Sequence, residues 1–308
     1  MKKIKYQGGI TKFVTCTAGN INKQKFKSHI ATSLGLSALN KAVNNGQYID
    51  MSVVSFSSAN DFTEQVFSIL SFLKYVSKPA EWVIYSDGSH TNDQIALLAE
   101  IFDFVKFKIY DWADSNAVFQ NIKPALAPYK DQFLDYGQKF PLGKRLYYYL
   151  NHNIEKPTLF LDSDVLFYNK AAALCNLLNE PYSGWFLPDA VWGCLDNSYK
   201  NKFVPQAYQV NGGFFILKKE LENISGGLDF LKSLNCRYEY FTEQTVMHIL
   251  LKDNGLMPLD PRIFILNSAD QFDFAYLYPR ESMAIRHYTG PVRHKMWQKN
   301  WKWHLALD

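Results

Sequence analysis

The chain has 308 residues, 47% of them hydrophobic, which is enough for one large α/β domain or two smaller ones. Its net charge of +4 by itself argues neither for nor against a nucleic-acid partner, and we predict none. No apolar run reaches transmembrane length, and the four cysteines form no CxxC pair, so we expect reduced thiols, no zinc finger and a cytoplasmic protein.

Short apolar strands alternate with amphipathic helices from residue 51 onward, which is typical of an α/β fold. Asp61 with Glu64, and Thr91 with Gln94, have the spacing of capping boxes at helix starts. This alternation favours a mostly parallel central sheet flanked by helices, with ligands beyond the carboxyl ends of the strands. We predict strands at 51–57, 81–85, 104–109 and 158–161, and helices at 62–76, 91–101 and 142–152.

The two ends of the chain do not fit this alternation. Residues 1–48 are predicted to be an N-terminal extension of unclear role, with a strand at 12–17 and a helix at 26–43. Residues 291–308 form a C-terminal segment in which basic residues alternate with three tryptophans. Such a segment either contacts a membrane surface that carries a lipid-linked acceptor or packs its tryptophans on the domain.

Two carboxylates follow the apolar strand at 158–161, in the run Leu161-Asp162-Ser163-Asp164. The two-residue period of a strand directs Asp162 and Asp164 to the same side. Bare anions beside an apolar core repel each other, so a divalent cation is a natural partner, and oxygen ligands suit Mn²⁺ or Mg²⁺. Taken alone, a D-x-D pair is also typical of a strand-end turn with solvated aspartates.

Three further motifs follow the acidic pair, and the four together carry a resemblance. They are Asn211-Gly212-Gly213-Phe214, Thr242-Glu243-Gln244-Thr245, and His287-Tyr288-Thr289-Gly290 followed by Lys295-Met296-Trp297. In this order, from about residue 51 to 297, the chain resembles GT-A glycosyltransferases of the retaining, glycogenin-like and bacterial lipopolysaccharide galactosyltransferase kind. The resemblance implies a Rossmann-like, nucleotide-sugar-binding GT-A fold, with residues 49–290 as the catalytic domain.

The resemblance also implies roles for individual residues. Asp162, Asp164 and His287 would bind Mn²⁺ or Mg²⁺, and Gln244 or Glu243 would lie on the face of the anomeric carbon opposite the leaving diphosphate. The chain departs from the family in having a longer loop after Gly290, so that either Arg293 or Lys295 would clamp the phosphates. The donor-binding set is Ser55, Ser57, Asp87, Lys144, Arg145, Ser163, Asn211, Gly212, Gly290, Arg293 and Lys295.

The implied function is transfer of a sugar, a hexose by preference, from a nucleotide-sugar to a glycan, lipid-linked or other hydroxyl acceptor with retention. UDP is the expected nucleotide, although Ser55 and Ser57 stand where relatives often have an acidic residue near uridine. Two alternatives are a haloacid-dehalogenase-like phosphatase with Asp162 as nucleophile, and a carbohydrate-binding relative without turnover. Each motif also has a purely structural interpretation when it is taken alone. The pair Gly212 and Gly213 could form a β-bulge, Glu243 and Gln244 could simply begin a helix, and His287 could be a structural histidine.

Overall fold

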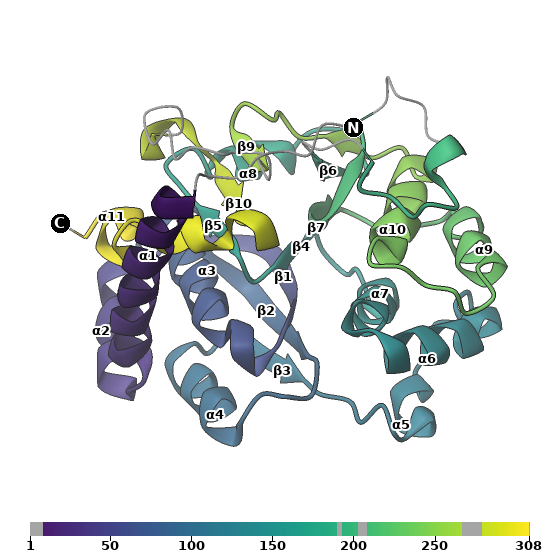
Figure 1. Ribbon diagram of the computed structural model, residues 1–308, viewed down its shortest axis with the longest axis horizontal. Coiled ribbons are helices and arrows are strands. Elements are labelled where there is room, and N and C mark those ends of the chain that lie inside the picture. Colours follow the sequence, from purple (N-terminus) through teal and green to yellow (C-terminus); the bar gives the residue numbers. More distant parts are fainter. Residues whose placement is uncertain (1–8, 190–192, 203–207, 267–278, 308) are drawn as a thin grey trace.

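A twisted seven-stranded sheet runs through the middle of the computed structural model, which describes residues 9–189, 193–202, 208–266 and 279–307 (Figure 1). Its strand order is β3-β2-β1-β4-β7-β6-β8, and only β7 runs antiparallel to its neighbours. The predicted mostly parallel sheet is therefore confirmed. The strands are β1 (Tyr48–Ser57), β2 (Lys78–Ser86), β3 (Val105–Lys108), β4 (Thr158–Asp162), β6 (Gly184–Pro188), β7 (Val210–Leu217) and β8 (Met257–Pro258).

Helices cover both faces of this sheet, as the two groups on either side of it in Figure 1 illustrate. One face packs on α1 (Gly9–Ile30), α2 (Ser33–Val43), α3 (Phe62–Tyr75), α4 (Asn92–Ile101) and α8 (Ala173–Leu177). The other packs on α5 (Ser115–Phe119), α6 (Lys130–Lys139), α7 (Pro141–Asn151), α9 (Ser225–Ser233) and α10 (Thr242–Asp253). The short α11 (Trp301–Leu305) follows the 3₁₀ turn η5 (Gly290–Trp297).

Alternate residues of the central strands enter the two cores. Val53 and Leu159 are fully buried on the α3 side, and Val54 and Phe160 on the α7 side. The ring of Phe160 stacks on Phe215 of β7 with centroids 4.7 Å apart. A strand buried on both faces needs a continuous apolar run, which is why the sequence of β4 carries no polar residue between Thr158 and Asp162.

A second, three-stranded sheet of order β5-β10-β9 adjoins the end of β4. Its strands are β5 (Val165–Phe167), β9 (Phe264–Leu266) and β10 (Ile285–His287). The chain passes from β4 through Ser163 and Asp164 directly into β5, and β10 pairs antiparallel with β5, with His287 opposite Val165. The backbone N–H of Tyr288 also donates to the carbonyl of Asp164 at 2.9 Å. This pairing brings a histidine 125 residues away in the sequence to the acidic turn.

The N-terminal residues are helical, so the predicted strand at 12–17 is wrong, and the predicted helix at 26–43 is two helices that meet at Thr32. Thr32 caps α2 by accepting a hydrogen bond from the N–H of Gly35. The β-branched residues of 12–17 favour a strand locally, but packing of α1 on η5 and α3 overrides that preference.

The two ends of the chain pack on each other. Phe26 of α1 contacts the rings of Trp297 and Trp301, with centroids 5.6 and 5.9 Å apart. Trp297 is buried, and Trp301 and Trp303 are half-buried against the core. The tryptophans therefore turn inward, which is the second of the two readings of this segment. Among the described residues, we find no helix with the length and apolar character that crossing a membrane requires.

The two predicted capping boxes differ in outcome. Thr91 and Gln94 form one at the start of α4, as predicted. Asp61 makes no side-chain cap on α3, so that prediction is wrong. Glu64 is instead fully buried, where it accepts hydrogen bonds from Lys23 at 2.5 Å and from Trp297 at 3.1 Å. Its partners come from the two ends of the chain and outcompete the local cap.

Candidate active site

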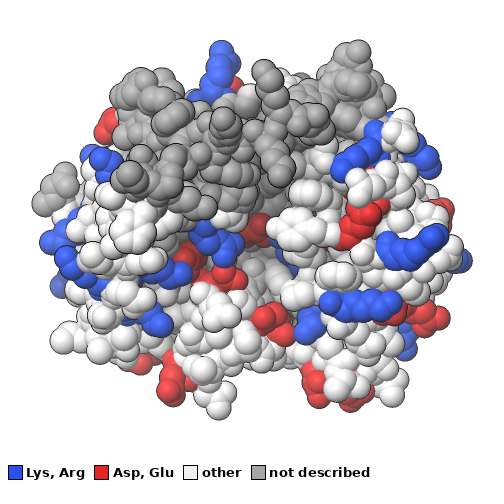
Figure 2. All heavy atoms as spheres, viewed as in Figure 1, with Lys and Arg blue, Asp and Glu red and all other residues white. Residues whose placement is uncertain are grey.

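A cavity of about 640 Å³ opens beyond the carboxyl ends of β1, β2 and β4, where a parallel sheet of this kind places its ligands. Figure 2 shows a hollow near the centre of this face, in which acidic and basic side chains meet. The described residues that line the cavity come from both sheets, from α7 and α10, and from η5. They include six acidic side chains and two arginines: Asp61, Asp87, Asp162, Asp164, Asp189 and Glu243, with Arg145 and Arg293.

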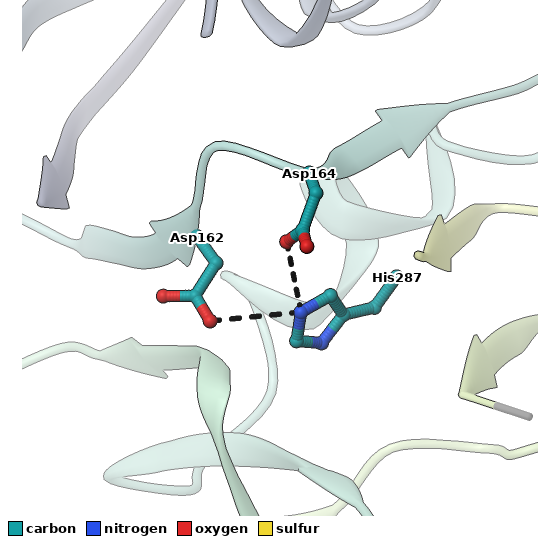
Figure 3. Close-up of side chains that lie close together, drawn as sticks. All are labelled: Asp162, Asp164 and His287. Atoms are coloured by element: carbon teal, nitrogen blue, oxygen red, sulfur yellow. Dashed lines mark ion pairs between the residues drawn. The ribbon is translucent and has the colours of Figure 1, made fainter. Parts of the chain in front are cut away.

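Asp162, Asp164 and His287 converge at the floor of this cavity (Figure 3). The Nε2 atom of His287 lies 3.1 Å from Oδ1 of Asp164 and 3.6 Å from Oδ2 of Asp162. One ligand atom from each residue can be chosen so that all lie within 4.8 Å of one another. Two carboxylates and an imidazole at this spacing suit a divalent cation, with room for other ligands from solvent or substrate.

Asn211 orients the imidazole of His287. Its Oδ1 atom lies 3.0 Å from Nδ1 of His287, and it also accepts a hydrogen bond of 3.0 Å from the N–H of Gly213. An amide oxygen can only accept, so Nδ1 carries the proton and Nε2 is the nitrogen that can offer a lone pair. Such an outer hydrogen bond is the usual support of a metal-binding histidine.

Gly213 leaves the space that the histidine and the first aspartate occupy. A Cβ atom at this position would lie 2.3 Å from Cε1 of His287 and 2.5 Å from Oδ2 of Asp162, closer than any real contact. The same atom on Gly212 would lie 3.3 Å from Oε2 of Glu243, which is a tight but tolerable distance. The second glycine of the motif is therefore the one that the floor of the cavity requires.

Asp164 is the most enclosed of the three candidate ligands, with 2% of its side chain exposed. Its Oδ2 atom accepts hydrogen bonds from Nε and Nη2 of Arg293 at 2.9 and 2.7 Å. Its Oδ1 atom is buried and faces Nε2 of His287 at 3.1 Å, and no other described residue pairs with it. Burial alone would raise the pKa of Asp164, but the charges of His287 and Arg293 lower it, so the carboxylate is ionised.

The opposite shift applies to His287. Burial disfavours its charged form, but the neighbouring carboxylate of Asp164 raises the pKa of the imidazole above its ordinary value. The cluster thus attracts positive charge at the position of Nε2. Either a proton or a divalent cation can supply that charge.

Arg145 links Asp162, one of the candidate metal ligands, to α10. Its Nη1 donates to Oδ1 of Asp162 at 2.5 Å, while Nη2 and Nε donate to the two oxygens of Glu243 at 2.5 and 3.3 Å. Although burial lowers the pKa of Arg145, the charges of Asp162 and Glu243 raise it well above its ordinary range. Both oxygens of Glu243 are engaged in this fork, so Glu243 acts on Asp162 through Arg145 and is not a free carboxylate.

Gln244 faces the cavity from the first turn of α10. Its amide nitrogen donates to the carbonyl of Cys194 at 2.8 Å and to Oδ2 of Asp189 at 3.2 Å. These two acceptors fix the orientation of the amide. Tyr240, just before the helix, also lines the cavity, with 73% of the residue exposed.

Most of the residues predicted for the site line the cavity. Besides the three candidate metal ligands, Glu243 and Gln244, they are Ser57, Asp87, Arg145, Ser163, Asn211, Gly290 and Arg293. Gly290 borders open space on its Cβ side, which leaves its backbone accessible.

Four residues of the predicted donor-binding set are not among the lining residues: Ser55, Lys144, Gly212 and Lys295. Ser55 lies one strand repeat below Ser57 and accepts a hydrogen bond from Trp82 inside the core. Lys144 donates to the carbonyl of Asp87 at 3.1 Å, so it supports the lining from behind. Lys295 is buried with 3% exposure, which leaves Arg293 as the cation of this loop that reaches the cavity.

Sequence reasoning missed several lining residues. Asp61 was taken only as a helix cap, yet its Oδ1 accepts a hydrogen bond from Nη1 of Arg293 at 2.8 Å. The run Leu187-Pro188-Asp189-Ala190 favours a turn aspartate over one that binds sugar hydroxyls, and Tyr240 lies in a segment without a recognisable motif. Gly213 was within the quoted motif, and the spacing from Asn211 to Gly213 on one strand face is the signal that could have distinguished it from Gly212.

Comparisons with known proteins support the fold. No protein-family model and no curated protein matches the chain. Among solved structures, it is similar to galactosyltransferase LgtC in complex with donor and acceptor sugar analogues, at 14% identity and a TM-score of 0.50, covering 80% of this chain and 95% of that one. It is also similar to the bifunctional glycosyltransferase WbbM in its apo form, at 14% identity and a TM-score of 0.52, covering 84% of this chain and 51% of that one.

The apo form of glycosyltransferase GlyE from Streptococcus pneumoniae TIGR4 gives a similar result, with 13% identity and a TM-score of 0.50 over 84% of this chain and 63% of that one. At these identities the likeness concerns the fold. The chain therefore has the fold of GT-A glycosyltransferases of the LgtC type, as its motifs predict.

Proposed function

We propose that the protein is a metal-dependent glycosyltransferase that moves a sugar, by preference a hexose, from a UDP-sugar to a hydroxyl of a glycan or lipid-linked acceptor, with retention of configuration. The observation that carries the proposal is the convergence of Asp162, Asp164 and His287 at the floor of a cavity on this fold. The buried Oδ1 atom of Asp164, which pairs only with His287 among the described residues, and the lone pair that Asn211 directs are what a divalent cation would use.

Mn²⁺ or Mg²⁺ held by these three residues would neutralise the negative charge that grows on the diphosphate when the sugar-phosphate bond breaks. Arg293 supplies a second positive charge at the cavity wall, where its guanidinium is held by Asp61 and Asp164. A guanidinium can bind phosphate oxygens with two parallel hydrogen bonds. Arg293 is therefore our candidate for the cation that clamps the diphosphate.

Gln244 is the candidate for steadying the reacting carbon. Its amide nitrogen is committed to Asp189 and to the Cys194 carbonyl. The amide oxygen is then the atom that can face the positive charge developing at the anomeric centre. Glu243 is better described as a positioning residue, because both of its oxygens bind Arg145. Retention then follows if the acceptor hydroxyl attacks from the face that the diphosphate leaves.

The phosphatase alternative has less support. A phosphatase of that class needs Asp162 as a free nucleophile, but Oδ1 of Asp162 accepts a hydrogen bond from Arg145. The described lining of the cavity contains arginines and no lysine. A carbohydrate-binding protein without activity would have the same cavity, so a measurement of turnover distinguishes it from an enzyme.

Release of UDP from UDP-hexoses, measured with and without Mn²⁺, tests the proposal. Wild-type protein should release UDP only with the metal, and Asp164→Asn should lose this release while Asp103→Asn retains it. Asp103 is a matched control because it lies on the surface and pairs only with Lys78. Metal-independent release, or equal activity of the two variants, would exclude the mechanism, and binding of UDP-sugar without any turnover would favour the binding protein. The anomeric configuration of the product, read by NMR, decides retention.

A further inference from the structure

Charge is distributed unevenly along the chain. Eight lysines and no acidic residue precede Asp50, whereas the chain from Asp50 onward has a net charge of −4 within an overall +4. An asymmetry of this size between two parts of one chain indicates contact with an anionic partner. The basic part includes α1, a helix of 22 residues that lies at the edge of the molecule (Figure 1).

One face of α1 packs on the protein. Phe26 and Ile30 are fully buried on this face, and a Cβ atom on Gly19 would lie 3.1 Å from the carbonyl oxygen of His294. Lys23 belongs to the same side, since it pairs with Glu64. The contact with the body of the protein is therefore made mainly by the second half of the helix.

The opposite face of α1 carries large apolar side chains that are exposed. Phe13, Val14 and Ile21 are 72%, 57% and 51% exposed, and their spacing along the helix puts them on one side. Lys25 and Lys27 flank this side, and both are exposed, without an ion-pair partner among the described residues. We call these five residues the α1 patch.

The C-terminal segment extends the positive charge beside the α1 patch. Trp301 stacks on His29 of α1, with ring centroids 5.3 Å apart, while Lys299 and Lys302 of the same segment are exposed. The exposed lysines of the two segments, Lys25, Lys27, Lys299 and Lys302, thus belong to the flank of the molecule where Figure 1 places α1 and α11. The tryptophans of the segment thus hold it against α1, and its lysines face outward.

We propose that the α1 patch docks the protein on a bilayer surface that contains anionic lipids. Lysines beside an apolar stripe match the two layers of such a surface, because the cations contact the headgroups while Phe13, Val14 and Ile21 enter the boundary of the acyl chains. A nucleic acid would use the lysines and leave the apolar stripe exposed to water. No residue of the patch lines the cavity, so this proposal stands or falls independently of the reaction.

Sedimentation of the full chain with vesicles tests the proposal. The protein should bind vesicles of phosphatidylcholine with 30% phosphatidylglycerol, bind pure phosphatidylcholine much more weakly, and dissociate as salt is raised. Each lysine near the surface contributes roughly fivefold to binding, so Lys25→Gln/Lys27→Gln should bind about 25-fold more weakly. Phe13→Ser/Ile21→Ser should weaken binding at both low and high salt.

The matched control is Lys219→Gln/Lys232→Gln, which removes the same charge from exposed positions around α9, on the opposite flank of the molecule. It should bind like the wild type. Equal losses in the two lysine pairs would overturn the assignment to α1, and so would binding of the wild type to a single-stranded RNA 20-mer but not to vesicles. An unchanged melting temperature and unchanged UDP release in solution establish that the variants are folded, and failure of UDP release in the wild type bears on the reaction alone.

Discussion

The substitution Gly213→Ala tests the geometry of the proposed metal site with a single methyl group. The added carbon would lie 2.3 Å from Cε1 of His287 and 2.5 Å from Oδ2 of Asp162, where ordinary contact begins at 3.4 Å. The imidazole, the carboxylate or β7 must then move by about 1 Å, and displacements of that size cost on the order of 100-fold in function. We expect Mn²⁺ to bind Gly213→Ala about 100-fold more weakly, a loss of about 2.7 kcal/mol.

The adjacent Gly212→Ala is the matched control, because the same methyl group there meets Glu243 and Arg145 at 3.3 Å or more. Thermal unfolding with and without Mn²⁺ reads out both variants. At a concentration 100 times the wild-type Kd, Mn²⁺ should stabilise the wild type and Gly212→Ala by about 2.7 kcal/mol and Gly213→Ala by only about 0.4 kcal/mol. Wild-type affinity in Gly213→Ala, or a larger loss in Gly212→Ala, would refute the proposed metal site.

Three other perturbations probe the support of the site and the core. Asn211→Ala leaves Nδ1 of His287 without its acceptor and should weaken Mn²⁺ binding about 10- to 100-fold in an EPR titration, whereas unchanged affinity would show that Asn211 does not orient the ring. Arg145→Gln leaves Glu243 buried without its partner and should lower the free energy of unfolding, measured in urea, by about 3–5 kcal/mol. The double variant Arg145→Met/Glu243→Leu removes both charges and should recover most of this loss. Equal losses in the two variants would contradict an unpaired buried charge as the cause. Acid should destabilise the protein between pH 6.5 and about 4, because burial lowers the pKa of three histidines to about 4, 4 and 3, so that the unfolded chain binds protons that the native state refuses. These are His152, His248 and His304. His287 has a raised pKa and contributes stability that is complete below pH 6.5, so it does not alter this window. The free energy of unfolding should fall with decreasing pH by at most about 4 kcal/mol per pH unit. A free energy of unfolding, measured by urea titration, that stays constant from pH 6.5 to 4.5 would contradict this prediction.

Local patterns were sufficient where a single segment decides the outcome. The apolar runs of β1, β2 and β4 and the capping box at Thr91 were predictable, because burial on both faces and the box depend on adjacent residues. The same reasoning failed at Glu64, whose partners Lys23 and Trp297 lie 41 and 233 residues away. No window of the sequence around Asp61 contains that information.

The candidate site follows the same division. The acidic pair was recognisable because its two carboxylates share one strand end, and His287 only through the resemblance of the surrounding motif. The fork from Arg145 to Glu243 was not predictable, since it depends on how α7 and α10 pack against each other on one face of the sheet. Ser55 was predicted to bind the donor but lies in the core. It faces the same side of β1 as Ser57, but Trp82 covers it. The two-residue period of a strand gives the side that a residue faces and does not tell how far along the strand the solvent reaches.

The η5 turn is shared between two surfaces that have no residue in common. Arg293 extends from it into the cavity, while the carbonyl of the next residue, His294, lies against Gly19 of α1. Asn22 of α1 also donates to the carbonyl of Trp297 at 2.9 Å. Helix α1 thus packs against the back of the turn that carries Arg293. A truncation that removes α1 would keep every residue that lines the cavity but would remove the contacts that hold this turn in place.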